Sequence, residues 1–238
     1  MPGADAVRPK RRTTKRAILM RQALLIVIPS LAALASSACV VGGGASGAPY
    51  AESQRHTYTG FEKVDVSAGV EVIASQGPFD VRAETTSGGN FDNLIVEARG
   101  NTLYVSRKST MFSWGGPHYR VTVSAPNYSS FGVSSGASLE SGALQLANLE
   151  VDVSSGGHLQ LVGACASLDA SVSSGGHFSG EGLKCETAEV NASSGGHAEA
   201  FATRTAEGNA SSGAHVTFYG NPAQIQKDSS SGGSIDAR

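Results

Sequence analysis

The stretch Ser154-Ser-Gly-Gly-His158 recurs along the second half of the chain. It returns three times, the last time with alanine in place of the second glycine: Ser173-Ser-Gly-Gly-His177, Ser193-Ser-Gly-Gly-His197 and Ser211-Ser-Gly-Ala-His215. Two copies that lack the histidine, beginning at Ser134 and Ser230, flank these four. Successive copies start 20, 19, 20, 18 and 19 residues apart. A repeat of this length with a turn signal in every copy is typical of stacked repeat proteins.

Apolar and polar residues alternate on both sides of each copy, as they do in half-buried β-strands. Counted from the first serine, the positions five, three and one before it and five after it are mostly apolar, as in Leu149, Val151, Val153 and Leu159. These positions share one parity, so we expect them to face the core. The same parity predicts that the second serine of each copy also points inward: Ser135, Ser155, Ser174, Ser194, Ser212 and Ser231.

The pattern therefore predicts an all-β fold: a single-stranded, right-handed parallel β-helix, or β-solenoid, with coils of about 19 residues. Composition agrees with this fold, since only 16% of residues are charged and 30 of 238 are glycine. A helical bundle needs more charged residues and fewer glycines. The formal net charge of −2 gives no positive field for nucleic acid, so we expect no nucleic-acid partner.

The N-terminus reads as an export signal. Seven basic residues lie in the first 21 positions, and an apolar run follows over residues 23–35. The run is too short for a comfortable transmembrane helix and ends in small residues before Cys39. We interpret residues 1–38 as a lipoprotein signal peptide, with translation alternatively starting at Met20, and residues 39–56 as the lipidated Cys39 with a flexible tether. Cleavage without lipidation, giving a secreted or periplasmic protein, is the alternative.

Residues 57–127 lack the serine repeat but still alternate like strands. The segments Thr59-Gly-Phe-Glu-Lys-Val-Asp-Val66, Gln76-Gly-Pro-Phe-Asp-Val81, Gly100-Asn-Thr-Leu-Tyr-Val105 and Tyr119-Arg-Val-Thr-Val123 resemble the putative auto-transporter adhesin, head GIN domain family. The resemblance covers residues 57–238, with N-terminal strands over 57–127 and repeats over 128–238. It implies an envelope protein of bacteria with a β-helical fold, and it supplies no catalytic residues.

Two outward-facing columns carry ionisable groups. Four residues after the first serine stand His158, His177, His197 and His215, and four residues before it stand Glu150, Asp169, Glu189 and Glu207. Stacked imidazoles could bind a transition metal between neighbours, but a linear row offers only two ligands per ion. We expect no bound metal and no cofactor, and a hydrated surface that responds to pH. The acidic column could hold Ca²⁺, although a solvated negative face is the simpler interpretation.

Two further features concern Cys165 with Cys185 and the loop over residues 109–118. The cysteines follow Ser154 and Ser173 by 11 and 12 residues, so they occupy nearly the same place on adjacent coils, and export favours their oxidation to a disulfide.

The loop over residues 109–118 carries Met111, Phe112 and Trp114, which either cover the open end of the core or form an aromatic contact site.

These observations predict a non-enzymatic, lipid-anchored outer-membrane protein that serves as an adhesion or scaffold module. Its partners would be the membrane, through the lipid, and an envelope polysaccharide or protein. A periplasmic ligand or metal-ion binder using the histidine column is the second hypothesis. A polysaccharide-processing enzyme is the third, since lyases and hydrolases occur among β-helices. From residue 129 onward, however, there are 11 acids and only four basic residues, without a mixed cluster of the two (Lys184, Arg204, Lys227 and Arg238).

Overall fold

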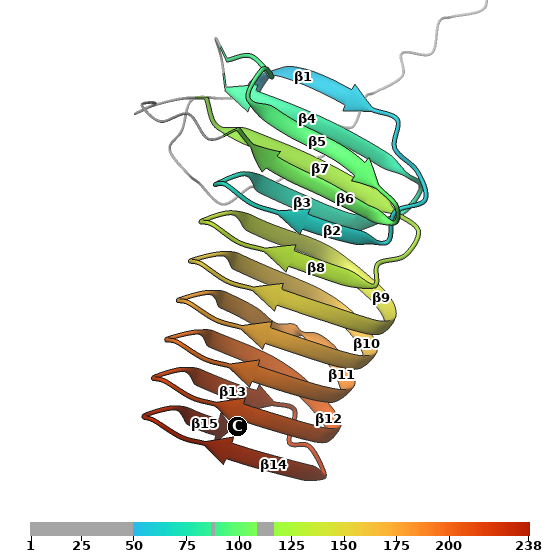
Figure 1. Cartoon of the computed structure of the whole chain (residues 1–238). Helices are drawn as coiled ribbons and strands as arrows, with labels where there is room; N and C mark the ends of the chain where they lie inside the picture. The colour runs from blue at the N-terminus through green and yellow to red at the C-terminus, as the bar shows by residue number, and fades with distance from the viewer. Residues whose placement is uncertain (1–49, 87–88, 109–116) are drawn as a thin grey trace, which may run out of the picture. The chain divides into compact units, whose positions relative to one another are not determined.

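The computed structural model describes residues 50–86, 89–108 and 117–238. These residues form strands and turns with no helix, so no described segment is a helix long and apolar enough to span a membrane. The strands stack coil upon coil from β2 to β14 as a β-solenoid (Figure 1). The predicted all-β solenoid is therefore confirmed.

Fifteen strands make up the described part of the chain. Before the repeats lie β1 Tyr50–His56, β2 Lys63–Val66, β3 Glu71–Gln76, β4 Asp80–Thr86, β5 Leu94–Arg99, β6 Thr102–Arg107 and β7 Tyr119–Ala125. Within the repeats lie β8 Ser130–Val133, β9 Ser138–Val153, β10 His158–Val172, β11 His177–Ala192, β12 His197–Ala210, β13 His215–Tyr219, β14 Gln224–Ser229 and β15 Ser234–Ala237.

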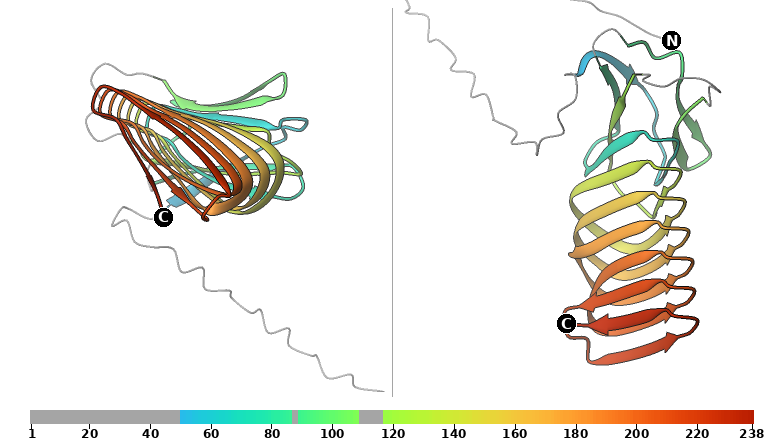
Figure 2. Two further views of the ribbon diagram at one scale, coloured as in Figure 1. Left: turned by 90° about the horizontal axis from the view of Figure 1, so that it is seen from below. Right: turned by 90° about the vertical axis from the view of Figure 1, so that its left-hand side faces the viewer.

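The repeat sets the register between coils. Strands β9, β10, β11 and β12 pair in parallel, and the same repeat position meets itself on each neighbour, as His158 with His177 and Asp169 with Glu189. Each of these long strands runs from one Ser-Ser-Gly turn round to the next, so one repeat makes one coil (Figure 2). Side chains of one column therefore lie about 4.8 Å apart along the stack.

The turn between coils explains the Ser-Ser-Gly signal and corrects one expectation. Ser155 and Gly156 have φ angles of 51° and 70°, and the Gly157 amide donates to the Ser154 carbonyl at 2.8 Å. Two positive φ values in sequence are what a type I′ turn requires. Alternation holds only for extended residues, so the predicted inward serine column is wrong: the second serines are exposed at the turn tip (Ser135, Ser155, Ser174, Ser194, Ser212 and Ser231).

The glycine with positive φ in each of these turns gives a stability prediction, made here for the turn after β10. Gly175 has φ of 70° and no heavy atom within 4 Å of the place that a Cβ would take, so Gly175→Ala should cost about 1–2 kcal/mol through backbone strain alone. Gly142 lacks a positive φ, and a Cβ there would lie 4.0 Å from the Ala74 carbonyl oxygen. Gly142→Ala should therefore change the free energy of unfolding by less than about 0.5 kcal/mol. Urea titration compares the two variants, and equal effects would contradict the turn geometry.

The solenoid begins earlier than the serine repeats. Strands β2 and β3 form a coil whose turn, with Ala68 and Gly69 at φ of 58° and 72°, matches the Ser-Ser-Gly turns. This coil pairs in parallel with β8 and β9 on one side and with β6 and β7 on the other. Three strands extend the sheet beyond β6 and β7 by antiparallel pairing: β4 pairs with β7, β1 pairs with β4, and β5 pairs with β6. Strands β5 and β6 form a hairpin that turns at Gly100.

One continuous apolar core fills the coils, and the columns predicted to face inward supply most of it. Leu159, Phe178, Ala198 and Val216 are fully buried one above another. The coil with β14 differs, because among the described residues no coil packs on its outer side: Ile225, Lys227 and Ser229 occupy inward repeat positions but are exposed. Here the predicted inward orientation does not produce burial. A charged inward residue such as Lys227 is a known way of protecting an open sheet edge from pairing.

Candidate functional site

The four predicted histidines form one ladder on the outer face, immediately after the turns. Ring centroids are separated by 4.8 Å between His158 and His177, 4.9 Å between His177 and His197, and 5.1 Å between His197 and His215. The rings are parallel to within 16°. The ladder follows directly from the strand register, which places each histidine opposite the next.

Acidic and hydroxyl side chains lie beside the two histidines of β12 and β13, His197 and His215. His197 Nε2 lies 4.0 Å from Glu199 Oε1, and His215 Nε2 lies 3.5 Å from Asp236 Oδ2. Among the described residues, no carboxylate oxygen lies within 4.0 Å of a ring nitrogen of His177, which stands between His158 and His197. Burial, followed by the neighbouring His158 and His197, lowers the pKa of His177 below its usual 6.5, while Glu199 acts weakly in the opposite direction.

The lowered pKa of His177 predicts how stability depends on pH. The native state releases this proton more readily than the unfolded chain, so its contribution is complete above about pH 6.5 and is lost as pH falls below that value. NMR titration should give an imidazole midpoint below 6.5 for His177. His177→Gln should reduce the loss of stability between pH 7 and pH 5. A midpoint at or above 6.5 would show that burial and the neighbouring histidines do not make protonation of His177 less favourable.

The geometry of the ladder bears on metal binding. Parallel rings direct their nitrogens alongside one another rather than toward a common point, whereas a metal site needs three or four converging ligands. Within residues 50–86, 89–108 and 117–238, no group of three or more His, Cys, Asp or Glu side chains could hold a metal ion.

The predicted acidic column is also in register. Glu150 meets Asp169, Asp169 meets Glu189, and Glu189 meets Glu207 on successive coils. Burial, then Glu189 and Glu150, raises the pKa of Asp169, as expected for carboxylates that repel one another. At the β2 end, Lys63 Nζ lies 3.4 Å from Glu150 Oε2. The column is a single file of acids with a cation at one end.

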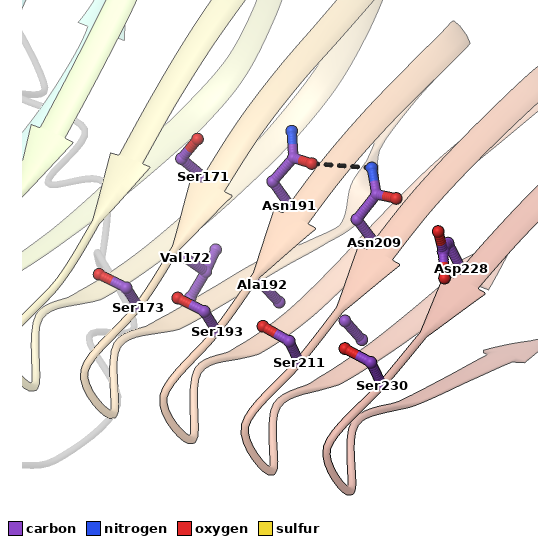
Figure 3. Close-up of a pocket in the computed structure, with 11 residues that line it drawn as sticks. Ser171, Val172, Ser173, Asn191, Ala192, Ser193, Asn209, Ser211, Asp228 and Ser230 are labelled. Atoms are coloured by element: carbon purple, nitrogen blue, oxygen red, sulfur yellow. Dashed lines mark hydrogen bonds between the residues drawn. The ribbon is translucent and has the colours of Figure 1, made fainter.

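A groove lies between the acidic column and the turns, and the sequence did not identify it as a site. One wall, here called the Asn row, consists of Asp152, Ser171, Asn191, Asn209 and Asp228; the other, the Ser row, consists of the first serines Ser154, Ser173, Ser193, Ser211 and Ser230. Figure 3 shows both rows except Asp152 and Ser154. A hollow of about 360 Å³ opens between the rows over β10 to β14, and a second of about 390 Å³ adjoins Asp152 and Ser154 and is otherwise lined from β2, β6 and β8. The residues between the rows turn their side chains into the core, so backbone forms the floor.

Side chains within the groove are held by a hydrogen bond between coils. Asn209 Nδ2 donates to Asn191 Oδ1 at 2.9 Å (Figure 3). At the β2 end, burial and then Asp152 raise the pKa of Asp65, which stands in the same outward column. The groove from Ser171 to Asn209 is therefore polar and uncharged; Asp228 adds a carboxylate at one end, and the β2 end carries acids together with Lys63.

The predicted cysteine pair lies near the middle of strands β10 and β11. Cys165 and Cys185 face one another in the β10–β11 register and are joined by a disulfide with a Cα–Cα distance of 4.4 Å. Both are buried. The predicted lipidation residue Cys39 and the aromatic residues Met111, Phe112 and Trp114 lie outside the described residues.

Comparison with known proteins identifies the family. The model of the putative auto-transporter adhesin, head GIN domain family matches residues 60–222. The chain belongs to this family. No curated protein matches it. The head GIN domain resembles the crystal structure of a putative adhesin from Bacteroides fragilis, with a TM-score of 0.61 and 14% identity over 79% of this chain and 96% of that one.

A second solved structure is similar to this head GIN domain over the same share of its length. It is a putative lipid binding protein from Parabacteroides distasonis, with a TM-score of 0.48 and 17% identity over 79% of this chain and 96% of that one. At such identities the likeness concerns the fold alone. The site must therefore be argued from the residues of this chain.

The sequence contained a signal for the groove. Asp152, Ser171, Asn191 and Asn209 are recognisable as one outward column two residues before the first serine. Alternation also places the first serines, two residues later, on the same outward face. What the sequence lacked was any sign that this face is hollowed between the two rows. The sequence signal would have been the pairing of these two polar columns in every repeat of the head GIN domain.

Proposed function

We propose that this protein is a non-enzymatic adhesion or scaffold module of the bacterial cell envelope, held at the outer membrane through a lipidated Cys39. The observation that carries the proposal is the register of the solenoid. It sets identical polar side chains one above another over successive coils, as in the histidine ladder with its 4.8–5.1 Å spacings. Such a surface is rigid and repetitive, which suits it to an extended partner.

Membership of an adhesin-named family supports this role, as does the arrangement of acidic groups. Polysaccharide-cleaving sites place two carboxylates on either side of the scissile bond, or combine acids with Lys or Arg. Glu150, Asp169, Glu189 and Glu207 instead stand in single file on one face. The cation closest to them, Lys63, is paired with Glu150. This arrangement favours binding over cleavage.

The anchor makes a separate prediction. Lipidated Cys39 should hold the protein in the membrane fraction, and Cys39→Ala should release it to the soluble fraction, because stable attachment requires the several acyl chains that modify such a cysteine. Fractionation of cells that express each form, with mass spectrometry of the N-terminal peptide, provides the measurement. A wild-type protein that is already soluble and unmodified would exclude the anchor.

A further inference from the structure

The groove between the Asn row and the Ser row runs across the coils rather than along one strand. The parallel register joins Asp152 to Ser171, Ser171 to Asn191, Asn191 to Asn209, and Asn209 to Asp228. One hollow lies between the two rows over β10 to β14, and the other, at the β2 end, meets these rows only at Asp152 and Ser154. The groove over β10 to β14 therefore offers a polar side chain on each wall about every 4.8 Å.

The groove offers hydrogen bonds of both kinds. The Asn191–Asn209 bond leaves the Asn191 amide NH₂ and the Asn209 carbonyl oxygen available to a ligand. In the part of the chain that the structure describes, the hydroxyls of Ser173, Ser193 and Ser211 make no hydrogen bond to other protein groups. Each hydroxyl can both donate and accept. A matching ligand must therefore present donors and acceptors at short, regular intervals.

Three classes of ligand fit the groove poorly. An anionic polymer meets Asp228 in the hollow over β10 to β14, whose described lining residues include no Lys or Arg. At the β2 end it meets Asp65 and Asp152, where the lining offers Lys63 as a cation. An apolar ligand would leave the amides and hydroxyls without partners, which is costly. A peptide strand binds through free backbone edges, but β10, β11 and β12, which form most of the floor, already pair with neighbours on both sides.

We propose that this groove binds a linear, uncharged glycan that lies across the coils with its hydroxyls bonded to the Asn and Ser rows. This inference rests on the proposed adhesion function and names the class of its partner. Sugar hydroxyls both donate and accept, as the two walls do. A chain molecule gains affinity by contacting several coils at once, since each coil repeats the same pair of groups.

The test uses the full chain carrying Cys39→Ala and calorimetric titration with linear neutral oligosaccharides of increasing length: β-1,4-glucans, β-1,3-glucans, α-1,4-glucans and β-1,4-mannans. At least one series should bind. Its affinity should rise with length until the ligand spans the coils from Ser171 to Asp228, about 14 Å or three spacings of ~4.8 Å. Asn191→Ala combined with Asn209→Ala should weaken binding at least about tenfold.

Asn148→Ala is the matched control. Asn148 is an exposed asparagine that also bonds to the next coil, accepting from Ser167 Oγ at 2.7 Å, but it lies outside the groove. It should leave affinity unchanged. Ser193→Ala with Ser211→Ala tests the other wall independently and should also weaken binding, so the proposal stays testable if the asparagine pair fails to fold.

Several results would overturn the proposal. They are no binding of any neutral series at millimolar concentration, equal weakening by Asn148→Ala, or groove-dependent binding of polygalacturonate or an unstructured peptide instead. Failure here is distinguishable from failure of the adhesion function. If the protein is retained on cell envelopes but the groove variants are retained equally well, adhesion stands and the glycan groove is wrong.

Discussion

Replacing Phe178 with alanine is expected to lower the free energy of unfolding by about 3–5 kcal/mol, the usual cost of removing a fully buried aromatic ring. Phe178 is 0% exposed and lies between Leu159 and Ala198 in the inward column after the turns. Its ring also occupies the space beside Gly180, where a Cβ would come within 2.6 Å of it. The neighbouring glycine and alanine are too small to fill the cavity that the substitution leaves.

Ile225→Ala is the matched control. Ile225 holds an inward repeat position in the last coil but is 41% exposed, so its truncation should cost well under about 1.5 kcal/mol. Urea titration of both variants compares the two losses of unfolding free energy. A loss below about 1 kcal/mol for Phe178→Ala would contradict the packing of the inward columns.

Removing the disulfide is expected to have the next largest effect. The bond closes a loop with a sequence separation of 20 residues, which corresponds to about 3 kcal/mol of stabilisation on a chain-entropy basis. Cys165→Ala with Cys185→Ala should therefore lower the unfolding free energy by about 2–4 kcal/mol. Both side chains are buried, so part of this loss comes from their packing.

A reductant separates the bond from the packing. Dithiothreitol should destabilise the wild type by most of that amount and leave the double variant unchanged. Labelling of both thiols in unreduced, denatured protein would show that no disulfide forms. The effect should be confined to stability, because Cys165 and Cys185 lie outside the groove between the Asn and Ser rows.

Much of the fold could be predicted from the repeat because its signal is local. A turn signal at constant spacing fixes where each coil turns, and alternation between turns assigns residues such as Val151 and Asp169 to opposite faces. Once coils stack in register, the histidine ladder and the closeness of Cys165 to Cys185 follow without further information. These predictions needed only two regularities: the alternation of side chains every two residues along a strand, and the return of the turn signal about every 19 residues.

The features that could not be predicted depend on pairing between distant or irregular segments. The coil formed by β2 and β3 lies between β6–β7 and β8–β9, out of chain order, and its turn reads Ser67-Ala-Gly69 rather than Ser-Ser-Gly. The orientation of Ser155 required its φ angle. The groove required the structure, since alternation places the Asn and Ser rows on one outward face but does not show where that face is hollowed.

Incubation of the full chain carrying Cys39→Ala with purified bacterial envelope fragments tests the central claim most directly, with retained protein and released sugar measured together. The account predicts saturable retention and no release of glycan fragments over time, because the solenoid binds without cleaving. Steady release of reducing sugar in proportion to protein concentration, or no retention above that of the urea-unfolded chain, would contradict it.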